Sequence, residues 1–238
     1  MKLIFIRHGE PNYDIDSLTE KGWREAEYLS ERTSRWDITD IYCSPLGRAQ
    51  DTVAASLKKL DRKAVTCDWL KEFDSPIVDP QTGKQVLPWD RKSDYLNTHP
   101  ELFDLDGWHQ SPDMISGNLK ENYEYVTAKM DELLVKYGYR RDGYRYLTEK
   151  NTHRDDVVVC FCHLGITGAL VSHLINVTPH QLWQGFFLAP TSVTVLGTEE
   201  RTPGEAYFRC QMMGDTSHLL LHSEPVSVYG SFTDPFQG

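Results

Sequence analysis

Two arginines and two histidines lie at or shortly after the ends of apolar or strand-like stretches of this sequence. They are Arg7, His8, Arg48 and His163. The planar fork of an arginine side chain binds two phosphate oxygens at once, and a histidine near a phosphate can exchange protons or act as a nucleophile. Together, the four residue types predict a site for a tetrahedral oxyanion. Such a site requires elements that bring residues from distant parts of the chain to one place.

Three strand-to-helix junctions would supply that arrangement. Residues 3–6 and 157–162 are short, continuous apolar runs, which are typical of strands buried in a parallel sheet. Residues 38–43 predict another strand. In open α/β sheets ligands bind beyond the carboxyl ends of the strands, so we expect both histidines to face one crevice. Arg48 would lie in the first turn of a helix, where free backbone N–H groups favour an anion.

The spacing of apolar residues predicts the layers around these strands. Helices are expected over residues 19–33, 46–60, 123–137 and 165–175, with Pro45 in the first turn of the second; strands are expected near 64–67, 192–197 and 206–212, and a hairpin turning at 142–143. This alternation predicts an α/β fold, a three-layer αβα sandwich with a mostly parallel central sheet, in a single domain over residues 1–238.

The periodicity fails between residues 73 and 119. Five prolines interrupt this stretch. Its large rings are Trp89, Tyr95, Phe103 and Trp108. A structureless loop of this length is unusual in a compact domain, so residues 73–119 are expected to form a separately packed insertion. The insertion starts at the rim of the predicted site and would act as a lid. Its rings would either contact the leaving group of a substrate or form a small core of their own.

Composition excludes several classes of protein. The formal charge of −10 argues against nucleic-acid and acidic-membrane binding, because affinity for polyanions comes mainly from neutralised phosphates. No apolar run approaches the roughly 20 residues that span a bilayer, and the segment after Met1 does not match a signal peptide. The five cysteines are odd in number and suit reduced thiols better than disulfides. A cytoplasmic protein is expected, and a homodimer is left open.

Five motifs, in order along the chain, resemble those of the histidine phosphatase superfamily, in the branch that includes cofactor-dependent phosphoglycerate mutases. The motifs are Arg7-His8-Gly9-Glu10; Leu18-Thr19 with Gly22 and Ala26; Ser44-Pro45-Leu46 followed by Arg48-Ala49-Gln50 and Thr52; Leu70 with Glu72; and His163 after its apolar strand. The resemblance covers about residues 1–72 and 120–215. A single Arg-His-Gly motif is a weak signal, whereas five motifs in order are a strong one.

The resemblance implies that His8 attacks phosphorus and becomes a phosphohistidine, which water then cleaves. Arg7, Arg48 and His163 would hold the equatorial phosphate oxygens in a loose transition state. Glu72 would give a proton to the leaving alkoxide and then accept one from the attacking water. This chemistry requires no metal and no cofactor.

Other positions complete or depart from the family pattern. Gly9 and Leu164 are further candidates for phosphate contact through their backbone, although Leu164 stands where the family often has glycine. Asp14 stands where an asparagine often touches the phosphate, so its carboxylate should point away or bond to a pocket residue. Glu72 lacks the Gly-x-x-Glu-Gly that usually follows it.

Three functions fit the resemblance. The first is a phosphomonoesterase of the histidine acid phosphatase type, acting on a small phosphorylated metabolite. The second is a phosphoglycerate mutase-type transfer, and the third is a non-catalytic phosphate-binding protein. A mutase must hold a second acidic group, and the insertion offers only Lys84, Arg91 and Lys92 as cations. This scarcity favours the phosphatase.

Overall fold

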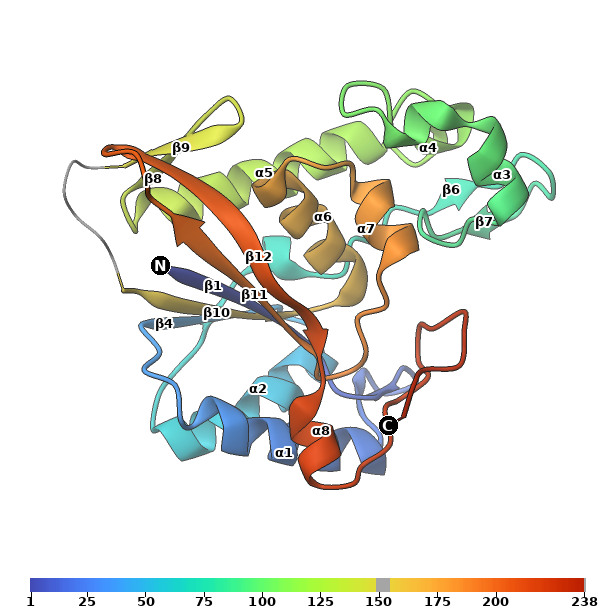
Figure 1. The fold of residues 1–238 in the computed structure, drawn as a ribbon. Helices are drawn as coiled ribbons and strands as arrows, with labels where there is room; N and C mark the ends of the chain where they lie inside the picture. Colours follow the sequence, from blue (N-terminus) through green and yellow to red (C-terminus); the bar gives the residue numbers. More distant parts are fainter. Residues whose placement is uncertain (149–154, 238) are drawn as a thin grey trace.

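A mixed sheet of eight strands lies between two layers of helices in the computed structural model, which describes residues 1–148 and 155–237 (Figure 1). Within these residues the strand order is β5-β4-β10-β1-β11-β12-β9-β8. The strands are β1 (Lys2–Arg7), β4 (Asp40–Cys43), β5 (Val65–Thr66), β8 (Tyr139–Asp142), β9 (Arg145–Thr148), β10 (Val157–Cys162), β11 (Val193–Glu199) and β12 (Glu205–Asp215). The predicted α/β sandwich is confirmed.

Parallel pairing occupies one half of this sheet. β1 pairs in parallel with β10, β10 with β4, and β4 with β5, whereas β11, β12, β9 and β8 are joined by antiparallel pairing. The expectation of a mostly parallel sheet therefore holds only for the half that runs from β5 to β1. A parallel partner requires a long crossover, and the short turn at residues 200–204 between β11 and β12 permits only the antiparallel arrangement.

The register between β1 and β10 places the carboxyl ends of the two strands at the same position along the sheet. Leu3 lies opposite Val158, and Arg7 lies opposite Cys162. Both strands are buried over almost their whole length, as their continuous apolar runs predict. Because the strands are parallel and level, the residues that follow them leave the sheet at the same edge. The pairing therefore brings the segments after Arg7 and Cys162 together.

The helices cover the two faces of the sheet (Figure 1). On one face lie α1 (Glu20–Thr33), α2 (Gly47–Leu60) and α8 (Ser217–Leu221); on the other lie α5 (Leu119–Val135), α6 (Leu164–Ile175) and α7 (Pro179–Gly185). The Thr19 hydroxyl caps α1 by accepting from the Gly22 N–H at 3.0 Å. Among the described residues, no helix has the length and apolar content needed to cross a bilayer.

Pro45 lies outside its helix, contrary to the prediction. Leu46 is the N-cap of α2 and still has extended backbone, so Pro45 precedes the helix by two residues. The Ser44 hydroxyl accepts a hydrogen bond from the Leu46 N–H at 3.2 Å. This local bond turns the chain before the helix begins, and it places Arg48 at the second position of α2.

The insertion after Glu72 contains short elements rather than one loop. They are β6 (Ile77–Val78), β7 (Gln85–Val86), α3 (Ser93–Thr98), the 3₁₀ turn η2 (Pro100–Phe103) and α4 (Pro112–Ser116); the turn η1 (Asp68–Leu70) precedes them, and β2 (Pro11–Asn12) pairs with β3 (Ser17–Leu18) elsewhere. Trp89, Tyr95 and Trp108 are buried in the same apolar cluster as α5 and α6, while Phe103 is exposed. The insertion therefore shares the main core instead of packing separately.

A buried ion pair fixes the middle of the insertion. Nη2 of Arg91 lies 2.9 Å from Oδ2 of Asp113, and both side chains are almost fully buried. The guanidinium also lies 3.5 Å from the Asp79 carboxylate and stacks 4.9 Å above the ring of Tyr95. One of the three cations of the insertion is therefore already neutralised by carboxylates.

Replacing Arg91 with methionine is expected to lower the free energy of unfolding by ~3 kcal/mol, because it leaves the Asp113 carboxylate buried without its partner charge. Urea denaturation would measure the loss. Arg145 provides a matched control, since its pairs with Asp142 and Glu205 are half-exposed and Arg145→Met should cost less than ~1 kcal/mol. If both variants lost the same free energy of unfolding, burial of the Arg91–Asp113 pair would not account for its contribution to stability.

All five cysteines are free thiols, as predicted. Cys43, Cys160 and Cys162 are buried in the strands. Burial raises the pKa of Cys162 to about 12, so this thiol stays protonated and unreactive at neutral pH. The cysteines of the central strands therefore act as small apolar residues of the core.

Candidate active site

The two histidines predicted from the strand ends lie side by side with tilted rings. The ring centroids of His8 and His163 are 5.0 Å apart, with an angle of 57° between the rings. His8 follows β1 and donates its backbone N–H to the Cys162 carbonyl at 3.0 Å, while His163 follows β10 and caps α6. Both side chains are almost completely buried. Because the two parallel strands end at the same position, His8 and His163 lie close together although they are far apart in the sequence.

The orientation of His8 suits attack by Nε2. Its Nδ1 lies 2.7 Å from the carbonyl oxygen of Gly9. A carbonyl can only accept, so Nδ1 carries the proton in this contact and the lone pair of a neutral ring resides on Nε2. Burial, followed by the charge of Arg7, lowers the pKa of His8 well below its ordinary value. The ring is therefore neutral at physiological pH, as a nucleophile must be.

Arg7 and Arg48 each keep an unused donor in the site. Nη1 of Arg7 donates to the carbonyls of Leu188 at 2.6 Å and Tyr229 at 3.0 Å. Nη1 of Arg48 contacts Oδ1 of Asp16 at 2.5 Å. Nε of both arginines is buried and has no partner among the described residues. A buried donor without an acceptor is costly, so the two guanidinium groups leave capacity for an anion.

Asp16, rather than Asp14, is the acidic residue beside the arginine. Asp14 is exposed and lies in a turn where its backbone N–H bonds to the Asn12 side chain. Asp16 has a positive φ of 47°, and its Oδ2 accepts from the Gly47 N–H at 2.7 Å. Asp16 therefore caps the start of α2 and orients Arg48 at the same time. Sequence patterns did not single out Asp16, because its partners lie about thirty residues away.

His163 is held by a serine of the third motif. Its Nε2 lies 2.8 Å from the Ser44 hydroxyl, and its Nδ1 is buried without a partner among the described residues. Burial, followed by His8 and the two arginines, lowers the pKa of His163 well below its ordinary value. Leu164 is the first residue of α6, where backbone N–H groups are free of helical partners. Ser44 belongs to the third sequence motif, but no local pattern of the sequence indicates that it is the partner of His163.

Glu72 reaches the site from the loop after η1. Its Oε1 accepts from the backbone N–H groups of Phe73 at 2.8 Å and Ile166 at 3.0 Å. Burial raises the pKa of Glu72 against the opposing effects of these two donors and of both arginines. Burial by the protein alone therefore favours the protonated form of this carboxyl.

The two arginines connect the candidate residues electrostatically. The charges of Arg7 and Arg48 act on His8, Glu72 and His163 alike. The strand ends, α2 and the loop after η1 therefore bring five predicted side chains into one site. Nucleophile, phosphate-binding cations and proton donor are the parts that phosphoryl transfer requires.

Gly9 has a packing role that needs no phosphate. Its N–H is donated to the Thr52 hydroxyl at 2.9 Å. A Cβ at this position would lie 2.8 Å from the Gly22 carbonyl oxygen, so only glycine permits this close approach of the chain to α1. Contact between Gly9 and a phosphate group stays a prediction.

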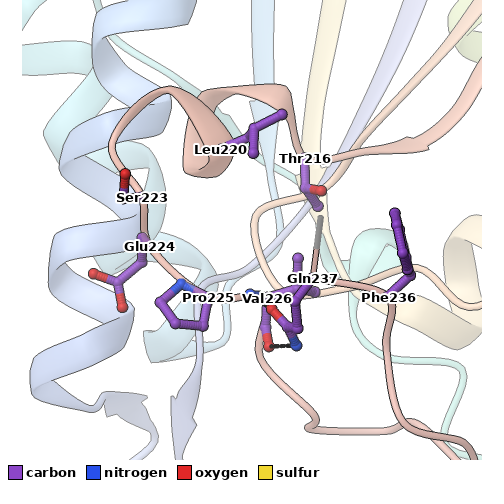
Figure 2. A pocket seen from close by; sticks show the side chains of 8 residues that line it. All are labelled: Thr216, Leu220, Ser223, Glu224, Pro225, Val226, Phe236 and Gln237. Carbon is purple, nitrogen blue, oxygen red and sulfur yellow. Dashed lines mark hydrogen bonds between the residues drawn. The ribbon is translucent and has the colours of Figure 1, made fainter.

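The segment after β12, residues 216–237, contacts the Arg7 side chain. No sequence motif predicts this contact. The Tyr229 carbonyl accepts from Arg7, and Gly230, at a φ of 81°, lies against the same guanidinium. Gln237 closes this segment into a loop through two hydrogen bonds with the Val226 backbone, at 2.8 and 3.2 Å (Figure 2). The adjoining cavity of about 450 Å³ is lined by residues from Thr216 to Gln237 and by none of the predicted site residues.

The chain is similar to known phosphatases and to a mutase. The family model of the histidine phosphatase superfamily (branch 1) matches residues 3–210. Probable phosphatase C1687.21 of Schizosaccharomyces pombe is 22% identical over 234 residues, which cover 92% of this chain and 95% of that protein. A 2,3-bisphosphoglycerate-dependent phosphoglycerate mutase of Thermoplasma acidophilum is 34% identical over 80 residues, 29% of this chain and only 40% of the mutase.

The fold is also similar to solved structures. A phosphoserine phosphatase from Entamoeba histolytica, in complex with phosphoserine, has a TM-score of 0.59 at 19% sequence identity, and the match covers 92% of this chain and 98% of that one. Similarity at this level of sequence identity shows a shared fold.

Proposed function

Because this chain belongs to the histidine phosphatase superfamily (branch 1), we propose that it is a phosphomonoester hydrolase that acts on a small phosphorylated metabolite through a phosphohistidine. The observation that carries the proposal is the state of His8. Its neutral ring is oriented by the Gly9 carbonyl, lies beside His163 and is influenced by two arginines with unused donors.

The first half of the proposed reaction transfers the phosphoryl group to the enzyme. Nε2 of His8 attacks phosphorus while the bond from phosphorus to the ester oxygen breaks. Arg7, Arg48 and His163 stabilise the charge on the equatorial oxygens. Glu72, whose pKa is raised by burial, gives its proton to the departing alkoxide, which leaves as an alcohol.

The second half returns the enzyme to its starting state. Glu72, now a carboxylate, accepts a proton from water as the water oxygen attacks phosphorus. The bond from phosphorus to His8 breaks, inorganic phosphate is released, and both His8 and Glu72 recover their initial protonation. Every step uses side chains of this protein, so the proposed mechanism is independent of metal.

Phosphoglycerate mutase-type transfer is the second candidate, and the partial similarity to the Thermoplasma mutase favours it. A mutase binds a second acidic group of its substrate. Arg91, one of the three cations of the insertion, is already paired with Asp113 and Asp79. The neutralised cation supports hydrolysis over mutase activity.

Hydrolysis of a generic aryl phosphate is expected to continue unchanged in EDTA and to be inhibited by vanadate, which mimics the pentacoordinate transition state. Steady-state assays with and without each reagent would measure both effects. Loss of activity in EDTA that zinc restores would indicate a metallohydrolase instead. A protein that binds phosphate but hydrolyses no aryl phosphate would be the non-catalytic homologue.

A panel of phosphorylated metabolites would then identify the leaving group. Release of inorganic phosphate from one member of the panel supports the hydrolase. Conversion of one phosphoglycerate isomer into another without phosphate release would assign the mutase reaction. Both assays use the same enzyme preparation, so they separate the two candidates directly.

A further inference from the structure

Two tryptophans pack on the glycines of α6. A Cβ on Gly165 would lie 2.3 Å from Cζ3 of Trp89, and a Cβ on Gly168 would lie 2.5 Å from Cδ1 of Trp183. Both glycines lie inside the helix, so it is the missing side chain, not an unusual backbone, that admits the rings. The insertion contributes one of these rings and α7 the other.

Trp89 meets the proposed acid at Gly165. The Cβ position that is too close to the Trp89 ring also lies 2.9 Å from Oε1 of Glu72. The indole and the carboxyl oxygen therefore both lie against α6 at the same glycine. The neighbouring N–H of Ile166 donates to that Oε1, which holds the carboxyl at the helix.

Several contacts fix the Trp89 ring in this place. Its side chain is only 8% exposed, and its ring centroid lies 5.8 Å from that of Trp183. The Gln184 side chain donates to the Trp89 carbonyl at 2.8 Å, and Trp183 donates to the Gly165 carbonyl at 2.9 Å. Trp89, Trp183 and Gln184 thus form one packed wall against α6.

Burial and neighbouring charges act on the Glu72 carboxyl in opposite directions. The charged and titratable groups that act on the carboxyl are Arg7 from β1, Arg48 from α2 and the Cys162 thiol of β10. Both arginines and the two backbone donors favour the ionised form, and the thiol stays neutral. Desolvation by burial is therefore the dominant influence that raises the pKa of Glu72.

We propose that Trp89 is a positioning residue for the acid: its indole covers the Gly165 side of the Glu72 carboxyl, excludes water there and keeps Glu72 protonated for the leaving group. This inference rests on the proposed function. It gives the insertion a part in the chemistry, because the ring that maintains the acid belongs to a different segment from the acid itself. It also accounts for glycine at position 165, where any side chain would displace the ring.

The test compares Trp89→Leu and Trp89→Phe with the wild type. Opening the wall should lower the pKa of Glu72, so the alkaline limb of kcat/KM for an alkyl phosphate should move to lower pH. A displacement of about one pH unit corresponds to a roughly tenfold loss above the limb. Phenylalanine retains part of the cover and should displace the limb less. Aryl phosphates with acidic phenols should lose much less activity than the alkyl substrate.

Trp108→Leu is the matched control. Trp108 is a tryptophan of the same insertion, 4% exposed, and it packs on Tyr123, His180 and Trp183. This variant should lose stability without moving the alkaline limb. If the Trp89 variants also lose stability while their limb stays in place, Trp89 is merely structural and the inference is wrong.

A measurement without substrate separates this inference from the proposed function. ¹³C NMR can follow the titration of the Glu72 carboxyl, assigned with Glu72→Gln, in the wild type and in both Trp89 variants. A lower midpoint in the variants supports the role of Trp89 even if no phosphomonoester is hydrolysed, which would contradict only the function. An unchanged midpoint in an active enzyme would overturn the role of Trp89 alone.

Discussion

Replacing His8 with alanine is expected to lower kcat by at least ~10³-fold, because binding alone cannot replace the covalent step. The variant loses the proposed nucleophile, whose neutral ring lies beside His163. Steady-state hydrolysis of an aryl phosphate would give the loss, and rapid quenching with a ³²P-labelled substrate would show whether a phosphoenzyme forms.

His173→Ala provides the control for this prediction. His173 lies in α6 and contacts the Asp131 carboxylate at 3.0 Å, outside the proposed site. Its replacement should leave turnover near that of the wild type. If His8→Ala retained near-wild-type turnover, or still formed an acid-labile phosphoenzyme, the nucleophile would have to be another residue.

Glu72→Gln should lower kcat by ~10²-fold or more for alkyl phosphates and much less for aryl phosphates with acidic phenols, because it removes only the transferable proton. The amide oxygen can still accept from Phe73 and Ile166, so the loop should keep its position. Measurement of kcat over a series of leaving groups tests the difference.

An equal loss on all leaving groups would assign the acid elsewhere. Asp74 is the nearest candidate along the chain; it is exposed, and its backbone N–H bonds to the Glu72 carbonyl at 2.7 Å. Asp74→Asn is therefore the matched variant. We expect it to keep the leaving-group dependence of the wild type.

Local patterns predicted the elements that carry the site. The apolar runs of β1 and β10 identify buried strands without reference to the rest of the chain, and Thr19 marks the start of α1. Because parallel strands share one carboxyl edge, His8 and His163 could be paired from the sequence. These predictions rest on signals within a few residues of each position.

Contacts between distant residues could not be predicted in this way. The ion pair of Arg48 with Asp16 and the bond from Arg7 to Tyr229 join positions 32 and 222 residues apart. Neither acceptor lies in a recognisable local pattern, so only the folded chain reveals them. In contrast, α7 carries a capping box between Thr178 and Gln181, a local signal that the sequence contains and that the prediction of helices passed over.

The bond between Arg7 and Tyr229 sets the order in which the site can be completed during synthesis. A ribosome adds about 5 to 20 residues per second, so roughly 10 to 45 seconds separate the arginine from its acceptor. A chain interrupted between residues 215 and 229 would contain all eight strands of the described sheet and still lack this partner of the Arg7 guanidinium. Full activity would thus report on synthesis through Tyr229, whereas a folded sheet would not.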